Sequence, residues 1–136
     1  MEMNEESILA WNIIEKTSAN LFLTGKAGTG KTTFLKQLKE KSPKRMVVLA
    51  PTGIAAINAG GMTIHSFFQL PFSPYIPGTT FGSGEQKRYQ FSKLKRNIIR
   101  SIDLLVIDEI SMVRSDLLDA IDSVLRQYRK RHDLPF

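Results

Sequence analysis

One stretch of the chain combines glycines with a lysine and a threonine in a spacing that suits phosphate binding. Residues 25–32 read Gly-Lys-Ala-Gly-Thr-Gly-Lys-Thr and match the pattern Gly-x-x-x-x-Gly-Lys-Ser/Thr at every position. Glycines let successive backbone N–H groups point at phosphate oxygens, and the positive end of a following helix adds to the attraction. We expect Lys31 to bridge the β- and γ-phosphates of a nucleotide and the Thr32 hydroxyl to bind Mg²⁺. The candidate nucleotide-binding residues are Gly25, Ala27, Gly28, Thr29, Gly30, Lys31, Thr32 and Thr33.

Two adjacent carboxylates, Asp108 and Glu109, follow the apolar run at residues 104–107. A buried parallel strand would deliver Asp108 to its carboxyl end, where open α/β sheets bind ligands, and Asp108 would there hold Mg²⁺ through water. Glu109 would orient and deprotonate an attacking water molecule. The alternative for such a pair alone is a simple turn at a strand end. Together with the phosphate motif, the pair indicates nucleotide hydrolysis, with Lys31 and Glu109 as the catalytic residues.

The surrounding pattern predicts strands alternating with helices. Short runs that are apolar throughout predict buried strands at residues 20–24, 46–50 and 104–107. Apolar side chains at helical spacing predict helices at residues 4–16, 32–41, 54–59, 87–100 and 115–131. Strands of this kind, alternating with helices, indicate a parallel sheet covered by helices on both faces. The prolines and glycines of residues 70–84 predict a long loop.

Composition narrows the classes of protein and partner. The chain has 136 residues with 19 Lys and Arg against 13 Asp and Glu, a net charge of +6 that favours a polyanionic partner. Its length suits one modest core. The absence of cysteine excludes disulfides and thiolate metal sites. No apolar run approaches the roughly 18 residues of a membrane span, and the acidic start is unlike a targeting peptide. We therefore expect no membrane partner and a cytoplasmic location, with nucleoid association if the source is bacterial.

Three stretches together resemble the Pif-one family of superfamily-one DNA helicases: residues 25–33, 50–68 and 108–112. The middle stretch is the specific one, because phosphate motifs and Asp-Glu pairs occur in many enzymes. Its Pro-Thr-Gly-Ile-Ala-Ala, followed by Thr-Ile-His-Ser-Phe-Phe, is similar to motif Ia of this family and its extension. One position departs from the family, which usually has an adenine-reading glutamine near the N-terminus where this chain has Ser7.

The resemblance implies a RecA-like P-loop NTPase fold, a three-layer α/β sandwich that uses ATP and Mg²⁺. Pro51, Thr52 and Gly53 would lie along single-stranded DNA together with residues 63–68. Threonine hydroxyls and glycine N–H groups suit phosphate contacts, and His65 and Phe67 could offer stacking faces to bases. The alternatives are a structural role for His65 and a place in the core for Phe67.

The same resemblance implies the motor domain of a five-prime to three-prime DNA helicase that acts in DNA repair, recombination or telomere maintenance. A second RecA-like domain at the C-terminal side would be a required partner, since helicase action needs two such domains closing on ATP. We expect residues 1–136 to be a partial first domain that binds nucleotide without unwinding. Its sheet would be truncated before its central strand, which in the family lies between the phosphate-motif strand and the Asp-Glu strand.

The sequence leaves alternatives open for the sheet, the basic segment and the function. Without the central strand, the phosphate-motif strand and the Asp-Glu strand either pair directly or leave an unstable, partner-seeking chain. The six basic residues within residues 87–100 form either a nucleic-acid face or a solvated helix face. The alternatives to a helicase are a P-loop kinase and a non-catalytic fragment that binds nucleotide or nucleic acid.

Overall fold

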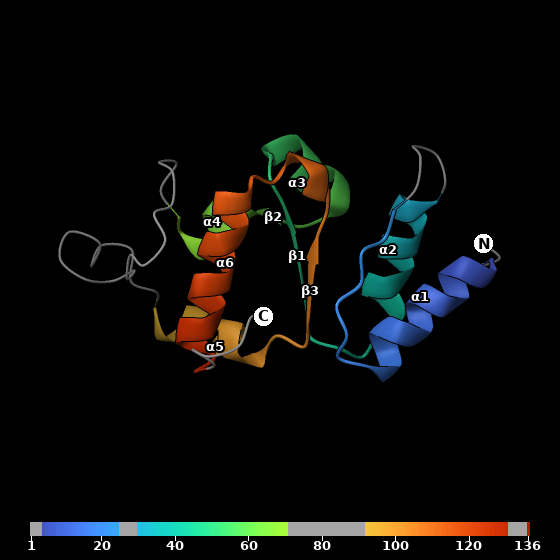
Figure 1. The fold of residues 1–136 in the computed structure, drawn as a ribbon, viewed down its shortest axis with the longest axis horizontal. Coiled ribbons are helices and arrows are strands. Elements are labelled where there is room, and N and C mark those ends of the chain that lie inside the picture. The colour runs from blue at the N-terminus through green and yellow to red at the C-terminus, as the bar shows by residue number, and fades with distance from the viewer. Residues whose placement is uncertain (1–3, 25–29, 71–91, 131–135) are drawn as a thin grey trace.

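A parallel sheet of three strands lies at the centre of the computed structural model, which describes residues 4–24, 30–70, 92–130 and 136 (Figure 1). The strands β1 (Met46–Ala50), β2 (Met62–Thr63) and β3 (Leu104–Ile107) are arranged in the order β2-β1-β3. In the register, Leu49 of β1 lies opposite both Met62 of β2 and Ile107 of β3. The carboxyl ends of the three strands therefore meet at one edge of the sheet.

Helices cover both faces of this sheet. One face carries α1 (Glu5–Lys16), α2 (Lys31–Lys41) and the end of α3 (Gly53–Ala59). The other carries α4 (Ile64–Phe68), α5 (Lys93–Ser101) and α6 (Ser115–Tyr128) (Figure 1). A short 3-10 helix, η2 (Ile110–Met112), follows β3. The expected three-layer α/β architecture with a parallel sheet is confirmed. No helix of the described ranges has the length and apolar character needed to cross a membrane.

The core divides between the two faces because side chains alternate along each strand. Val48 of β1 faces Leu35 and Ala59, with Val106 of β3 packed alongside. Leu49, the next residue, is fully buried on the opposite face among side chains of α4, α5 and α6. Both faces of the central strand are thus covered, which explains why its sequence is apolar throughout.

The strand predicted at residues 20–24 is absent from the described sheet. These residues have no regular secondary structure, and Phe22 is 70% exposed. In Figure 1 the segment runs between β3 and α2 without joining the sheet. A strand needs a neighbour for its backbone N–H and C=O groups, and among the described residues β3 pairs only with β1. Direct pairing of the two strands, one of the two expected outcomes, is therefore not what the structure shows.

The helix boundaries follow local signals. The N–H of Ser7 donates to Asn4 Oδ1 at 2.8 Å, so Asn4 caps α1. The helix α2 ends at Lys41, directly before Ser42 and Pro43, as predicted. Helix α6 ends at Tyr128. Residues 71–84 of the predicted loop and 87–91 of the basic segment lie outside the described residues, as does residue 131.

Candidate nucleotide and nucleic-acid site

The start of α2 has the properties of an anion-binding helix terminus. Gly30 precedes it in the left-handed conformation, with φ 93°, and no side chain caps the helix. The first intrahelical hydrogen bond runs from the N–H of Phe34 to Gly30 O at 2.9 Å. The N–H groups of residues 31–33 come before it and so have no acceptor within the helix. The first turn holds no acidic residue. The positive end of the helix dipole therefore has no carboxylate in the first turn to offset it.

Packing fixes where this helix begins. Phe34, Leu35 and Leu38 are buried against the sheet, and the Phe34 ring meets Trp11 of α1 edge to face at a centroid distance of 6.2 Å. In the first turn of α2, ahead of these buried residues, Lys31 and Thr32 are exposed. The phosphate-motif residues 25–29, including Gly25, Ala27, Gly28 and Thr29, lie outside the described residues.

Asp108 and Glu109 form a sharp turn where β3 ends. The N–H of Asp108 donates to Leu49 O at 2.8 Å, which extends the pairing with β1 by one residue. Glu109 adopts the left-handed conformation, with φ 55°, and its N–H donates to Asp108 Oδ1 at 3.0 Å. This conformation is uncommon for residues other than glycine. As a result, the Asp108 carboxylate is held against the turn while the Glu109 side chain is exposed.

The candidate DNA residues follow the neighbouring strands. Pro51 comes directly after β1, and the Thr52 hydroxyl accepts from the N–H of Ala55 at 3.2 Å and so caps α3. After β2, the Thr63 hydroxyl caps α4 in the same way, through the N–H of Ser66 at 3.1 Å. Each hydroxyl accepts one hydrogen bond in its cap and can also donate its hydrogen to another acceptor. Gly53 is exposed and faces open space, since a Cβ atom placed there would meet nothing within 4 Å.

Phe67 is a core residue, which corrects the expectation that it offers a stacking face. Only 4% of its surface is exposed, and its ring meets Phe68 edge to face at 4.9 Å. Lys95 of α5 places its Nζ 4.2 Å from the centre of the Phe67 ring, a cation–π contact. Partial burial in this position lowers the pKa of Lys95. His65 is half-buried, and its role at DNA stays a prediction.

The sheet register brings three parts of the candidate site to one edge. Thr63 lies opposite Ala50, next to Pro51, and Asp108 continues the pairing of β3 with β1. The start of α2 lies at the same end of the sheet (Figure 1). The helix caps at Thr52 and Thr63 were not predicted, although a threonine directly before a helix is a recognisable capping signal. The left-handed turn at Glu109 was not predicted either, because this residue type gives no signal for it.

A family model, a sequence relative and two solved structures all point to the same protein family for this chain. The PIF1-like helicase family matches residues 3–136. The chain is 36% identical over 145 residues to the ATP-dependent DNA helicase PIF1 of Saccharomyces cerevisiae, with all of this chain and 15% of that protein covered. It is 50% identical to Bacteroides sp Pif1 in complex with ADP-AlF4, with a TM-score of 0.89, and covers 30% of that chain. Bacteroides Pif1 bound to ssDNA gives 50% identity and a TM-score of 0.86.

These matches extend over essentially this whole chain but only part of each relative. The chain spans about a third or less of the relatives it matches. The match in fold includes the parallel sheet and the helix layers on both of its faces. With the family matched over residues 3–136, this chain belongs to the PIF1-like helicases and has the RecA-like P-loop fold of their ATPase domain.

Proposed function

We propose that this chain is the nucleotide-binding part of a DNA helicase motor that hydrolyses ATP while bound to single-stranded DNA. One observation supports this most strongly. The uncapped start of α2 and the Asp108-Glu109 turn lie at the same end of one parallel sheet. Open α/β sheets bind ligands at this end. The related Bacteroides Pif1 has been solved in complex with ADP-AlF4 and bound to ssDNA.

In this proposal the start of α2 binds the phosphates of ATP. Lys31 contributes its positive charge, and the N–H groups of Thr32 and Thr33 donate to phosphate oxygens. The Thr32 hydroxyl and the Asp108 carboxylate are hard oxygen ligands, the kind that Mg²⁺ prefers alongside water and phosphate. Bound Mg²⁺ would neutralise charge on the phosphates. The described residues therefore fit both ATP and Mg²⁺.

Glu109 is proposed to accept the proton of the attacking water. Its exposed side chain leaves room for a water molecule, and the turn holds it beside Asp108. A carboxylate that is not committed to a metal suits a general base. Asp108 and Glu109 would then divide the work, with Asp108 directed to the metal and Glu109 to the water.

DNA is proposed to follow the ends of β1 and β2. The Thr52 hydroxyl, the open surface at Gly53 and the start of α3 offer donors to backbone phosphates. Contacts of this kind do not read sequence, as a motor that moves along DNA requires. A second RecA-like domain would complete the site, so we expect the 136-residue chain alone to hydrolyse ATP slowly or not at all.

The fate of the γ-phosphate distinguishes this function from its alternatives. The longest natural chain that contains these residues should release inorganic phosphate from ATP, and single-stranded DNA should raise the rate. Transfer of phosphate to another acceptor without DNA would indicate a kinase instead. Binding of ATP or DNA without turnover would indicate a non-catalytic protein.

A further inference from the structure

The helix α3 is short, and contacts at both of its ends determine its position. It has seven residues, and isolated helices of this length are unstable in water. Thr52 caps the end that faces the proposed DNA. What holds the other end therefore also sets where the proposed DNA contacts lie.

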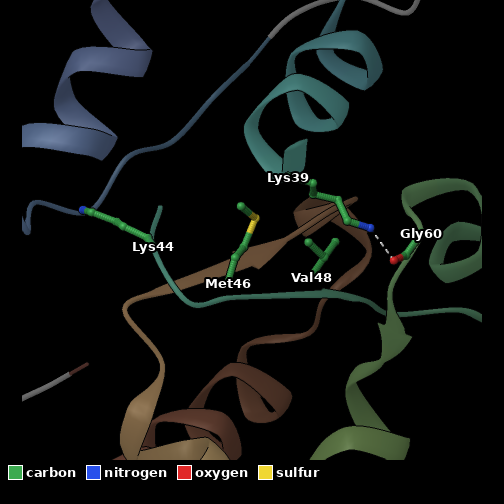
Figure 2. Close-up of a pocket in the computed structure, with 5 residues that line it drawn as sticks. All are labelled: Lys39, Lys44, Met46, Val48 and Gly60. Atoms are coloured by element: carbon green, nitrogen blue, oxygen red, sulfur yellow. Dashed lines mark hydrogen bonds between the residues drawn. The ribbon is translucent and has the colours of Figure 1, made fainter. Parts of the chain in front are cut away.

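A lysine from α2 occupies the other end of α3. Gly60 ends the helix in the left-handed conformation, with φ 70°, and its N–H donates to Ile57 O at 3.1 Å. Beyond this turn, Lys39 Nζ donates to Gly60 O at 2.5 Å and lies 3.5 Å from Ala59 O (Figure 2). A cation at a helix C-terminus satisfies exposed carbonyl oxygens and offsets the negative end of the dipole.

Two adjacent glycines make this approach possible. A Cβ atom at Gly60 would lie 2.6 Å from Lys39 Nζ, and one at Gly61 would lie 2.1 Å from Val48 O. Any larger residue would therefore displace either the lysine or the strand. Lys39 and Gly60 also line a pocket of about 300 Å³ above β1, with Met46 and Val48 at its floor (Figure 2).

We propose that Lys39 is a positioning residue that couples the nucleotide site to the DNA site. The helix α2 carries Lys31 and Thr32 at its start and Lys39 in its last turn. The helix α3 carries the proposed DNA contacts at its start and receives Lys39 at its end. A shift of α2 on nucleotide binding would thus be passed to α3. This role rests on the function proposed above.

The test compares Lys39→Met with Lys39→Arg in the longest natural chain. Methionine keeps the length of the side chain and removes its charge, while arginine keeps the cation. We expect Lys39→Met to raise the DNA concentration for half-maximal ATPase stimulation about three- to tenfold. In the absence of DNA, the KM for ATP and the ATPase rate should stay unchanged, and arginine should restore the DNA response. Lys36→Met, exposed on the same helix, is the matched control and should match wild type.

Two outcomes would overturn this role. The first is a Lys39→Met variant whose DNA response equals wild type. The second is an equal loss of DNA-free and DNA-stimulated rates that arginine does not restore, since this would show a merely structural role.

Amide hydrogen exchange tests the contact independently of DNA activity. Residues 53–61 should exchange faster in Lys39→Met than in wild type or Lys36→Met, and equal exchange would rule the contact out. If wild type shows no DNA stimulation but the exchange difference is present, the proposed function fails while the link between α2 and α3 stands.

Discussion

Glu109 combines two features that rarely occur in one residue. It is a charged, exposed side chain, and its backbone is left-handed, with φ 55°. Strained conformations of this kind persist where the surrounding structure fixes them. Here the Asp108 carboxylate accepts from the Glu109 N–H at 3.0 Å, and Glu109 O accepts from the N–H of Met112 at 3.0 Å. The turn thus directs two adjacent carboxylates differently, which suits two separate chemical roles.

Replacing the proposed base should separate binding from hydrolysis. Glu109→Gln keeps the size of the side chain but cannot accept a proton, so we expect kcat for ATP hydrolysis to fall about 10²–10⁴-fold. The affinity for ATP should change little, because Glu109 is not assigned to the phosphates. Steady-state kinetics and nucleotide titration of the longest natural chain check this, with the exposed Glu40→Gln as control. A kcat equal to wild type would contradict the assignment.

Among the elements, cations from elsewhere in the chain contact the carboxyl ends of three helices, α1, α3 and α5. Lys39 of α2 contacts the end of α3, and Lys44 Nζ donates to Ile14 O and Thr17 O at the end of α1. Arg129, after α6, donates to Ile99 O at 2.9 Å and Ile102 O at 3.0 Å at the end of α5. These contacts satisfy carbonyl groups that helices leave unpaired.

The amino ends of β1 and β3 are joined by a charged pair. The N–H and Nε of Arg45 donate to Asp103 Oδ2 at 3.0 and 3.2 Å, and the N–H of Asp103 donates to Arg45 O at 2.9 Å. The hydrogen bond from the Arg45 backbone, helped by its side chain, lowers the pKa of Asp103. The pair therefore supports the strand register while Asp103 is ionised.

This pair should give a defined pH dependence. A lowered pKa in the folded state means that the contribution of Asp103 to stability is complete above its unfolded pKa, about 3.9. It is lost as the pH falls through the lower folded value. Wild type should thus exceed Asp103→Asn in free energy of unfolding at neutral pH, and the difference should shrink below about pH 4. Denaturant unfolding across pH checks this, with the exposed Asp119→Asn as control. A difference that grows in acid would contradict it.

The elements could be predicted from the sequence where one local pattern decides them. The apolar runs and the helical spacing predicted β1, β3 and the helices α1, α2, α3, α5 and α6, but not the short elements β2, α4 and η2. Contacts between helix ends could not be predicted, because Lys39 and Gly60 are joined by the fold and not by sequence spacing. A core position for Phe67 was one of its two interpretations from sequence, but the contact of Lys95 with its ring could not be predicted, for the same reason.

At the scale of the whole molecule, one edge of the sheet remains open in the described structure. The apolar residues Leu21, Phe22 and Leu23 are exposed, and β3 has no described neighbour on the side away from β1. The apolar run of residues 20–24 predicted a strand, and the described structure has none there, because a strand forms only where a partner supplies hydrogen bonds. A further strand between residues 20–24 and β3 would supply hydrogen-bond partners to the backbone N–H and C=O groups of both segments.

A longer chain should order this segment. We expect the amides of residues 20–24 to exchange quickly in the 136-residue chain and more slowly in the longest natural chain, because a paired strand protects its N–H groups. Hydrogen exchange with the amides of α1 as internal reference measures the difference. Equally fast exchange in both chains would show that no strand pairs there.

The nucleotide site itself can be tested on the 136-residue chain by thermal unfolding with and without magnesium and ATP. A ligand that binds only the folded state raises Tm, and at tenfold Kd we expect a rise of about 3–5 °C. Lys31→Ala should remove the rise, while Lys36→Ala, on the same helix, should keep it. No rise in wild type, or an equal rise in Lys31→Ala, would contradict a phosphate site at the start of α2.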